Sequence, residues 1–292
     1  MPELPEVESL RRSLTPVIIG KTVRRVTVLR PDIVHGSAKP AHLLAGARIT
    51  RLTRHGKQLA ICGSDGNGRC PGVCVHLGMS GSMRYRPPGD QRPPNDPHVH
   101  VIWYLDDRSR LEFRDPRRFG GLWGCSDADR LIGERWSRLG DDALRVRPAA
   151  LHRRLSGTHR SIKAALLDQS LLAGLGNIYV DELLFACRLH PLTAANRLTL
   201  SGVQMLVRRT RRLLRTAIGA GGSTLRDYTD AAGQPGWFQT THKVYGRAGQ
   251  PCRSCRQPLG RLKVAGRTTV WCRRCQLPTN SSPVPMRELR RG

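Results

Sequence analysis

Three residues at the start of the chain could carry out covalent chemistry on a sugar. Pro2 follows Met1, and its small side chain permits removal of that methionine, which would leave a secondary amine at the chain end. A neutral α-amine is a nucleophile near pH 7, because its reference pKa is about 7.7–8.0. Attack on a sugar C1′ would form a permanently charged iminium, which acidifies the C2′ proton and permits strand cleavage by elimination. Glu3 could protonate the ring oxygen and Glu6 could relay protons; the alternative is that these residues only begin a helix.

Four cysteines near the end of the chain have the spacing of a metal site. They form two Cys-x2-Cys pairs separated by sixteen residues: Cys252, Cys255, Cys272 and Cys275. Four thiolates complete a tetrahedral shell and leave no position for water, so we expect one structural zinc ion. Two disulfides are the alternative, which a cytoplasm disfavours. The other cysteines show no ligand spacing and are expected to be buried or loop thiols: Cys62, Cys70, Cys74, Cys125 and Cys187.

Between the cysteine pairs the sequence predicts a β-hairpin. Residues 259–264 and 268–271 have strand-like composition, and Ala265-Gly266 supplies the turn. Arg267 would then lie at the tip of a hairpin that metal braces at its base. Its planar guanidinium can bond two phosphate oxygens at once, although it could equally be a surface arginine.

Composition and charge favour a polyanionic partner. The chain has 292 residues, enough for two domains, with 49 basic and 22 acidic residues and a net charge of +27. The first 150 residues carry +9 and the remainder +18. Nucleic acid is the favoured partner; a ribosomal or other RNA-scaffold role and an anionic membrane surface are alternatives. No apolar segment approaches the roughly 18 residues of a membrane span, and the acidic start is unlike a signal peptide, so we expect a soluble cytoplasmic protein.

The residues up to about 130 predict an antiparallel β-sandwich preceded by one helix at 3–14. Short β-branched or alternating segments separated by turn residues indicate the strands, at 22–29, 48–53, 58–62, 72–76, 98–105 and 110–113. From about 131 the pattern becomes helical, with helices expected at 161–173, 177–187 and 201–218. The last helix carries an arginine run, for which a solvated face is favoured over phosphate contact: Arg208, Arg209, Arg211, Arg212 and Arg215.

Several motifs in order resemble the formamidopyrimidine-DNA glycosylase family. They are MPELPEVE at the start, HLGMSGSMR at 76–84, DPRRFGG at 115–121, GLGNIYVDELLF at 174–185 and the cysteine module. The resemblance implies an α+β protein of two domains, with an N-terminal antiparallel β-sandwich and a C-terminal helix–two-turns–helix domain that bears a zinc-bound β-hairpin. The expected division is 1–130 for the sandwich, 131–250 for the helical domain, 251–275 for the zinc finger and 276–292 for a disordered tail.

The resemblance also implies roles for individual residues. Pro2 matches the family's nucleophile and Glu3 its acid, with Glu6 in support. Phosphate contacts are expected from Lys57, Asn177 and Arg267, of which Lys57 and Arg267 also count among the catalytic group. Asn177 could instead be a simple N-cap of its helix. The residues that would probe the duplex and fill the gap left by a flipped base are Met79, Arg117 and Phe119, with His98 as a further DNA contact. The loop at about 222–245 resembles the lid over the flipped base.

These expectations converge on a bifunctional DNA glycosylase and AP lyase that excises oxidised purines, such as 8-oxoguanine and formamidopyrimidines, from damaged double-stranded DNA. Zinc is the expected cofactor, and a bacterial, nucleoid-associated monomer is the expected state. Two alternatives stay open. One is an endonuclease VIII-like enzyme for oxidised pyrimidines, and the other is a non-catalytic zinc-containing nucleic-acid-binding protein on the same scaffold.

Overall fold

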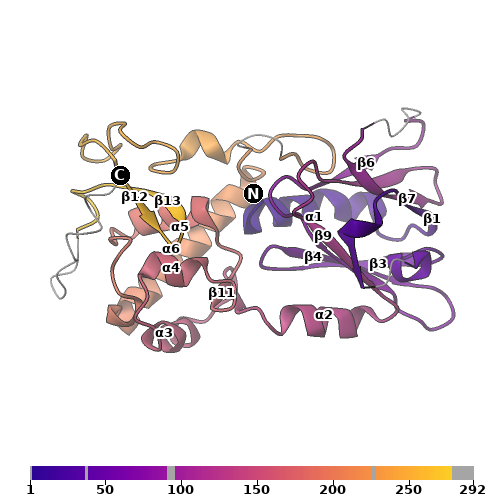
Figure 1. Ribbon diagram of the computed structural model, residues 1–292, viewed down its shortest axis with the longest axis horizontal. Coiled ribbons are helices and arrows are strands. Elements are labelled where there is room, and N and C mark those ends of the chain that lie inside the picture. Colours follow the sequence, from indigo (N-terminus) through magenta and orange to yellow (C-terminus); the bar gives the residue numbers. More distant parts are fainter. Residues whose placement is uncertain (1, 37–38, 91–95, 225–227, 278–292) are drawn as a thin grey trace. The chain divides into compact units, whose positions relative to one another are not determined.

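The chain forms two compact units, visible in Figure 1. The computed structural model describes residues 2–36, 39–90, 96–224 and 228–277. The first unit combines Met1–Arg138 with Ala217–Gln239, and the second combines Leu139–Thr216 with Thr240–Gly292. Within the described residues, no helix has both the length and the apolar character needed to cross a membrane.

Helix α1 (Leu4–Ile18) opens the first unit and begins where the sequence predicts. Glu3 is its N-cap and forms a capping box with Glu6, a reciprocal pair of side-chain contacts that satisfies free backbone N–H groups. The helix continues past its predicted end, through Pro16, to Ile18. The predicted end was wrong because Ile18 is fully buried in the core, and this packing offsets the backbone hydrogen bond that proline cannot donate.

Two sheets form the predicted β-sandwich around one hydrophobic core. The first has the strand order β1-β7-β8-β6: β1 (Val23–Val28), β7 (Val99–Leu105), β8 (Arg110–Arg114) and β6 (Ser82–Arg86). The second has the order β2-β9-β5-β4-β3: β2 (Val34–Gly36), β9 (Gly121–Cys125), β5 (Gly72–His76), β4 (Gln58–Ser64) and β3 (Arg48–His55). All six predicted strands are present. Strands β2, β6 and β9 were missed because they are short, rich in arginine or interrupted by glycine.

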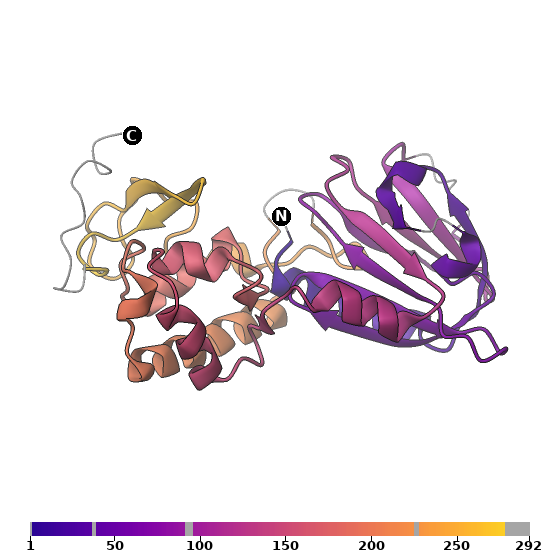
Figure 2. The same ribbon diagram turned by 60° about the horizontal axis from the view of Figure 1, so that its bottom comes forward.

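Helix α2 (Ala128–Trp136) packs on strands β4, β5 and β9 (Figure 2). Asp127 is its N-cap, and the Asp127 carboxylate accepts hydrogen bonds from two backbone N–H groups of the first turn. Cys74 is buried under this helix beside Leu131, on the opposite side of the sheet from the main core. A Cβ atom on Gly72 would lie 2.6 Å from the Cβ of Ala128. The absence of a side chain at Gly72 therefore allows the helix to approach the sheet closely at this point.

The second unit contains the predicted helices and the zinc-finger hairpin. Its regular elements are α3 (Pro148–Ser156), α4 (Ile162–Leu167), α5 (Asn177–Ala186), most of α6 (Leu200–Gly219), and the strand pairs β10 (Asp141–Asp142) with β11 (Leu172–Ala173) and β12 (Gly260–Val264) with β13 (Arg267–Trp271). Short 3₁₀ turns in the two units are η1 (Pro31–Ile33), η2 (Pro40–Leu43), η3 (Ala195–Arg197) and η4 (Phe238–Thr241). The α+β fold class, with a sandwich followed by a helical domain and a hairpin, is thereby confirmed.

Helix α4 is shorter than the predicted helix at 161–173. Asp168 ends it, because its carboxylate accepts hydrogen bonds from the backbone N–H and the hydroxyl of Ser170 and so closes a turn. The chain then forms the short strand β11, which pairs in parallel with β10. Leu172 and Ala173 are buried in that strand. Their apolar character favoured a longer helix in the sequence, but the turn at Asp168 ends the helix before it reaches them.

Segment 217–239 belongs to the first unit, whereas the predicted helical domain 131–250 included it. Ala231 lies in the sandwich core, its backbone N–H donates to Ser13 Oγ at 3.2 Å, and its carbonyl accepts from the backbone N–H of Tyr85 at 2.9 Å. The base of the expected lid is therefore held by the sandwich. Residues 225–227 of that lid lie outside the described residues.

The tail expected at 276–292 lies outside the described residues from 278 onward. Its first residue is part of the folded unit: Gln276 is fully buried, accepts a hydrogen bond from the backbone N–H of Cys272 and donates one to the carbonyl of Leu189. A buried amide with both ends bonded is ordered by its surroundings, so the folded part of the chain extends beyond the last cysteine.

Candidate active site and DNA-binding residues

The start of the chain is buried and held by its own helix. Pro2 is buried, and only 2% of Glu3 is exposed. The backbone N–H of Glu3 donates to Glu6 Oε2 at 2.7 Å, which fixes the direction in which the chain enters α1. The positive end of the helix thus lies beside the two predicted reagents.

Glu6 connects this start to the base of the expected lid. Its other oxygen, Oε1, accepts a hydrogen bond from the backbone N–H of Ser223 at 2.7 Å, and its carbonyl accepts one from the Tyr228 hydroxyl at 2.7 Å. Gly222 makes this contact possible, because a Cβ there would lie 2.8 Å from Glu6 Oε1. Glu6 is 1% exposed, and its carboxylate bridges two segments that are far apart in sequence. Its geometry suits a positioning residue.

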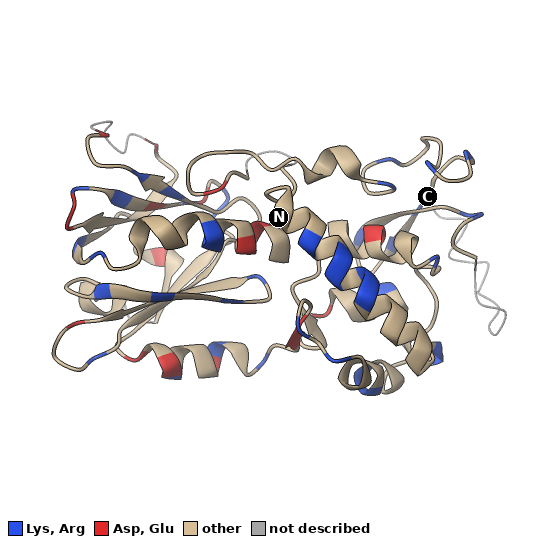
Figure 3. Ribbon diagram, turned by 180° about the vertical axis from the view of Figure 1, so that it is seen from behind, with Lys and Arg blue, Asp and Glu red and all other residues tan. Residues whose placement is uncertain are grey.

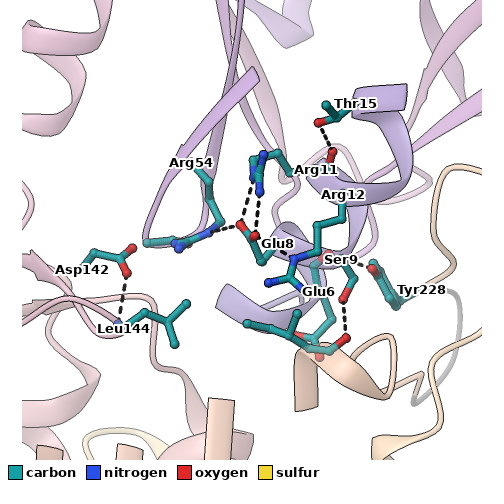
Figure 4. A network of polar contacts seen from close by, with 12 residues as sticks. Glu6, Glu8, Ser9, Arg11, Arg12, Thr15, Arg54, Asp142, Leu144 and Tyr228 are labelled. Carbon is teal, nitrogen blue, oxygen red and sulfur yellow. Dashed lines mark hydrogen bonds and ion pairs between the residues drawn. The ribbon is translucent and has the colours of Figure 1, made fainter. Parts of the chain in front are cut away.

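Lys57 lies in the turn between β3 and β4 and is buried for most of its length. The preceding arginine, Arg54, donates to the carbonyl of Gly56 at 2.9 Å and to Glu8 of helix α1 at 3.0 Å. Figure 4 shows the Glu8 carboxylate surrounded by three arginines, Arg11, Arg12 and Arg54. The turn that carries Lys57 is therefore tied to the same helix that presents Pro2.

The pKa of Glu8 reflects this environment. Burial by itself would raise it, but the hydrogen bonds from the three arginines outweigh burial and lower the pKa to about 2. A carboxylate that stays charged over the whole physiological range keeps the connection between α1 and β3 intact.

The three expected probe residues lie on two neighbouring loops of the sandwich. Met79 is 40% exposed and Phe119 is 57% exposed, unusual values for large apolar side chains. The guanidinium of Arg117 lies over the Phe119 ring at 4.7 Å from its centroid, a cation–π contact. Exposed apolar groups beside a cation suit insertion into a base stack. His98 lies in the turn directly before β7, half-buried, and its backbone N–H donates to Asp96.

Asn177 and the hairpin that carries Arg267 meet in the second unit. Gly176, not Asn177, is the N-cap of α5, so the simple capping role for the asparagine is wrong. The Asn177 side-chain amide instead donates to the carbonyl of Thr268 at 2.9 Å. Arg267 precedes Thr268 and is exposed at the first position of β13.

The hairpin has the turn that the sequence predicts. Ala265 and Gly266 both have positive φ, 48° and 71°, which is the backbone of a type I′ turn and matches the twist of two paired strands. Arg267 pairs with Val264 immediately after this turn. The hairpin therefore presents its arginine at the predicted tip.

The four predicted cysteines form a site that fits zinc. Their Sγ atoms lie within 4.8 Å of one another, with Cys255 and Cys272 at 3.4 Å and Cys252 and Cys275 at 4.0 Å. A tetrahedral site with Zn–S bonds of about 2.3 Å requires sulfur atoms about 3.8 Å apart. Two backbone N–H groups also point at the sulfurs, from Ser254 to Cys252 and from Cys275 to Cys272. Such N–H groups stabilise thiolates, the form that binds metal.

Three family models match successive parts of the chain. The N-terminal domain of formamidopyrimidine-DNA glycosylase matches residues 1–122, its H2TH domain matches residues 139–229, and the zinc finger found in FPG and IleRS matches residues 249–277. The chain belongs to the formamidopyrimidine-DNA glycosylase family. The resemblance seen in the sequence motifs is confirmed, and the four cysteines are the ligands of the family's zinc finger.

Relatives in the formamidopyrimidine-DNA glycosylase family match nearly the whole chain. The Bacillus subtilis formamidopyrimidine-DNA glycosylase is 39% identical over 281 residues, covering 94% of this chain and 99% of its own length. The crystal structure of MutM (FPG) from Thermus thermophilus is 40% identical, with a TM-score of 0.81, over 95% of this chain and all of that one. A Lactococcus lactis FPG mutant, in complex with a DNA containing Fapy-dG, is 32% identical with a TM-score of 0.84, over 94% and 99% of the two chains.

Two acidic residues of α5 hold neighbouring segments of the second unit; they lie within the motif at 174–185, but no role was expected for them. Asp181 accepts a hydrogen bond from the backbone N–H of Val270 and pairs with Lys163, so it attaches the zinc-finger hairpin to the helices. The Glu182 carboxylate accepts from the backbone N–H groups of three successive residues, Lys243, Val244 and Tyr245. The feature of the sequence that could have identified them is a pair of adjacent acidic residues in an otherwise apolar helix, because buried charges of this kind need partners.

The arginine run of α6 is mostly solvent-facing, as favoured. Arg208, Arg209, Arg212 and Arg215 are exposed along a helix that contains no acidic residue (Figure 3). Arg211 differs, because its guanidinium donates to the carbonyl of Val146 at 2.9 Å and so helps to pack the unit.

Proposed function

We propose that the protein is a bifunctional DNA glycosylase and AP lyase that excises oxidised purines from duplex DNA during base excision repair. The observation that carries the proposal is the buried start of the chain, where Pro2 and Glu3 open α1 and Glu6 ties them to Ser223. The substrate class is supported by relatives named formamidopyrimidine-DNA glycosylase and by a relative's structure with Fapy-dG DNA.

The chemistry starts after removal of Met1, with Pro2 as the nucleophile. Its nitrogen bonds to C1′ of the flipped nucleotide, and the bond from C1′ to the base breaks with its electron pair leaving on the base. The proton that the nitrogen loses passes to the Glu3 carboxylate, and Glu3 then donates it to the ring oxygen. The protonated oxygen leaves C1′, which opens the sugar and leaves an iminium, while the expelled base takes a proton from water. Loss of a C2′ proton expels the 3′ phosphate, and a second elimination expels the 5′ phosphate. The product is a gap of one nucleotide with phosphate ends.

The remaining predicted residues bind the duplex. Lys57, Asn177 and Arg267 contact phosphates on either side of the lesion, with the bidentate guanidinium of Arg267 gripping two oxygens. Met79 and Phe119 fill the space of the extruded base, and Arg117 hydrogen-bonds to the base left opposite it. His98, beside the probe loops, adds a further contact to DNA. The zinc ion is structural and holds the hairpin that carries Arg267.

Borohydride trapping tests the proposal directly. An 8-oxoguanine duplex mixed with the mature protein and borohydride is expected to give a covalent protein–DNA complex, because reduction fixes the iminium. Protein that retains Met1 has no free proline nitrogen and should give none. Pro2→Gly provides a primary amine and should trap weakly. Absence of a complex with the mature protein would favour a non-catalytic zinc-containing nucleic-acid-binding protein.

A substrate panel tests the lesion class. Faster excision of oxidised thymine or cytosine than of 8-oxoguanine opposite cytosine would replace the proposal with an endonuclease VIII-like activity. We also propose that the protein acts as a monomer on the bacterial nucleoid in the cytoplasm, in keeping with its bacterial relatives. Sedimentation of the free protein checks the monomer, and fluorescence imaging of a tagged copy checks the location.

A further inference from the structure

Asp115 connects the two loops that carry the expected probe residues. It is fully buried, and its two carboxylate oxygens bond to different loops. Oδ1 accepts a hydrogen bond from the Ser80 hydroxyl at 2.6 Å, and Oδ2 accepts one from the backbone N–H of Gly120 at 2.7 Å. Met79 directly precedes Ser80, and Phe119 directly precedes Gly120. One buried side chain therefore holds the immediate neighbours of both exposed apolar residues.

The two loops touch through their backbones, so neither can shift independently. Gly78 has a φ of +59°, and a Cβ there would lie 2.3 Å from the carbonyl carbon of Phe119. A Cβ on Gly120 would lie 2.7 Å from the carbonyl oxygen of His76. Both positions therefore require glycine, because a side chain at either one would clash with the backbone of the neighbouring loop.

Arg117 is part of the same arrangement. Its backbone N–H donates to Ser80 Oγ at 3.2 Å and to Asp115 Oδ1 at 3.3 Å. Its guanidinium lies over the Phe119 ring. The orientation of the residue expected to contact the opposite base thus depends on the same carboxylate that locates the two apolar probes.

The backbone of Asp115 is itself attached to the sheet. Its N–H donates to the carbonyl of His98 at 2.9 Å, and its carbonyl bonds to Nε2 of His100 at 2.8 Å. Among the described residues, none forms an ion pair with Asp115. The hydrogen-bond donors that contact its carboxylate come from the two loops, so replacing the carboxylate weakens those contacts.

We propose that Asp115 is the positioning residue that sets specificity for the base opposite the lesion, by fixing the distance and orientation between Met79 and the Arg117–Phe119 pair. The proposal rests on the proposed glycosylase function and on the probe roles of those three residues. A side chain that hydrogen-bonds to the edge of a base distinguishes one base from another by the geometry of those bonds. A shift of about 1 Å disrupts that geometry. Asp115 acts through the loops and touches neither substrate nor reacting atoms.

The test compares excision of 8-oxoguanine opposite cytosine with excision opposite adenine, as the ratio of single-turnover rates. In Asp115→Asn the amide nitrogen cannot accept from a backbone N–H, so the backbone N–H of either Arg117 or Gly120 loses its acceptor on this side chain. We expect the ratio to change by about tenfold, the factor that corresponds to one buried hydrogen bond. Because both rates come from one preparation, a general loss of folded enzyme cancels in the ratio.

Asp32→Asn is the matched control. Asp32 forms an exposed ion pair with Arg118 of the same loop, so the substitution makes the same chemical change on a surface contact. Its ratio should equal that of the wild type. If Asp115→Asn fails to fold, Ser80→Ala removes only the hydroxyl that bonds to Oδ1, and the ratio should shift in the same direction by less. An unchanged ratio in a folded Asp115→Asn or Ser80→Ala variant overturns the proposal.

Arg117→Ala separates this proposal from the function on which it rests. If Arg117→Ala changes the ratio and Asp115→Asn does not, the positioning role of Asp115 is overturned and the glycosylase function stands. If Arg117→Ala leaves the ratio unchanged, the probe role itself is overturned, and this proposal with it. If the wild type excises no 8-oxoguanine, the proposed function is what fails.

Discussion

Glu8 and Arg54 join helix α1 to strand β3 through an ion pair of 3.0 Å, in which both side chains are nearly inaccessible to solvent. Arg54 also bonds to the carbonyl of Gly56, directly before Lys57. The helix that presents the predicted nucleophile and the turn that presents the predicted phosphate ligand are thus parts of one connected structure. A substitution that breaks this connection should therefore disturb both of them.

Glu8→Gln should destabilise the first unit, because the amide keeps the shape but loses the charge that three arginines contact. We expect the free energy of unfolding at pH 7 to fall by about 2 kcal/mol, as for a buried hydrogen bond to a charged group. Since the folded-state pKa of Glu8 is lowered from 4.5 to about 2, its contribution is complete above pH 4.5 and is lost as the pH falls toward 2. Urea unfolding across this range should show the variant and wild type converging at the acidic end.

Asp129→Asn is the control for this prediction. Asp129 forms an exposed ion pair with Arg51, also of β3, and an exposed pair contributes about 0–1 kcal/mol. Equal losses in the free energy of unfolding of Glu8→Gln and Asp129→Asn would contradict a larger contribution from the buried pair.

Gly222→Ala should slow excision by displacing Glu6. A methyl group there would lie 2.8 Å from Glu6 Oε1, and the φ of +85° adds strain of about 1 kcal/mol. Gly233→Ala is a matched control, because Gly233 has a φ of +84° with no atom within 4 Å of the added Cβ. Gly233→Ala should lose only the stability that the backbone strain costs, whereas Gly222→Ala should lose more in thermal unfolding, and only Gly222→Ala should lose kcat. A similar kcat in both would show that Glu6 does not support the reaction.

Arg267→Ala should weaken binding of damaged and undamaged duplexes equally, by about 1–3 kcal/mol, if its guanidinium grips phosphate. The slope of log affinity against log salt should lie near −5 for the wild type, if about six phosphates are neutralised, and should decrease in size by about one in the variant. Arg261→Ala, on the other strand of the same hairpin, serves as a comparison. A selective loss for one lesion would mean that Arg267 contacts bases instead.

Removal of zinc should abolish the contribution of the hairpin to duplex affinity while leaving the sandwich folded. Native mass spectrometry should find one zinc ion per chain, since the four sulfurs form one closed site. After chelation, duplex affinity should fall to that of Arg267→Ala or lower, because the hairpin depends on metal for its base. Full affinity in metal-free protein would contradict a bracing role for the ion.

Features set by neighbouring residues were predictable from the sequence. The cysteine pairs, the Ala265-Gly266 turn and the start of α1 each depend on residues a few positions apart, and short-range geometry determines them. The same holds for the acid–amine pair at Pro2 and Glu3, since adjacency in the chain places the two reagents together. Local steric and hydrogen-bonding rules therefore determined these parts of the fold and of the site.

Contacts between distant segments were decided only by the tertiary structure. Nothing local indicates that Glu6 meets Ser223, that Asp115 holds Ser80, or that Asp181 holds Val270. Asp168 ended a helix that its apolar neighbours favoured, and a buried Ile18 extended another past a proline. The sequence by itself determined which candidate reagents and ligands this protein has. The fold decided which buried carboxylates hold them in place, because each of these carboxylates is satisfied by donors from segments that only long-range packing brings together.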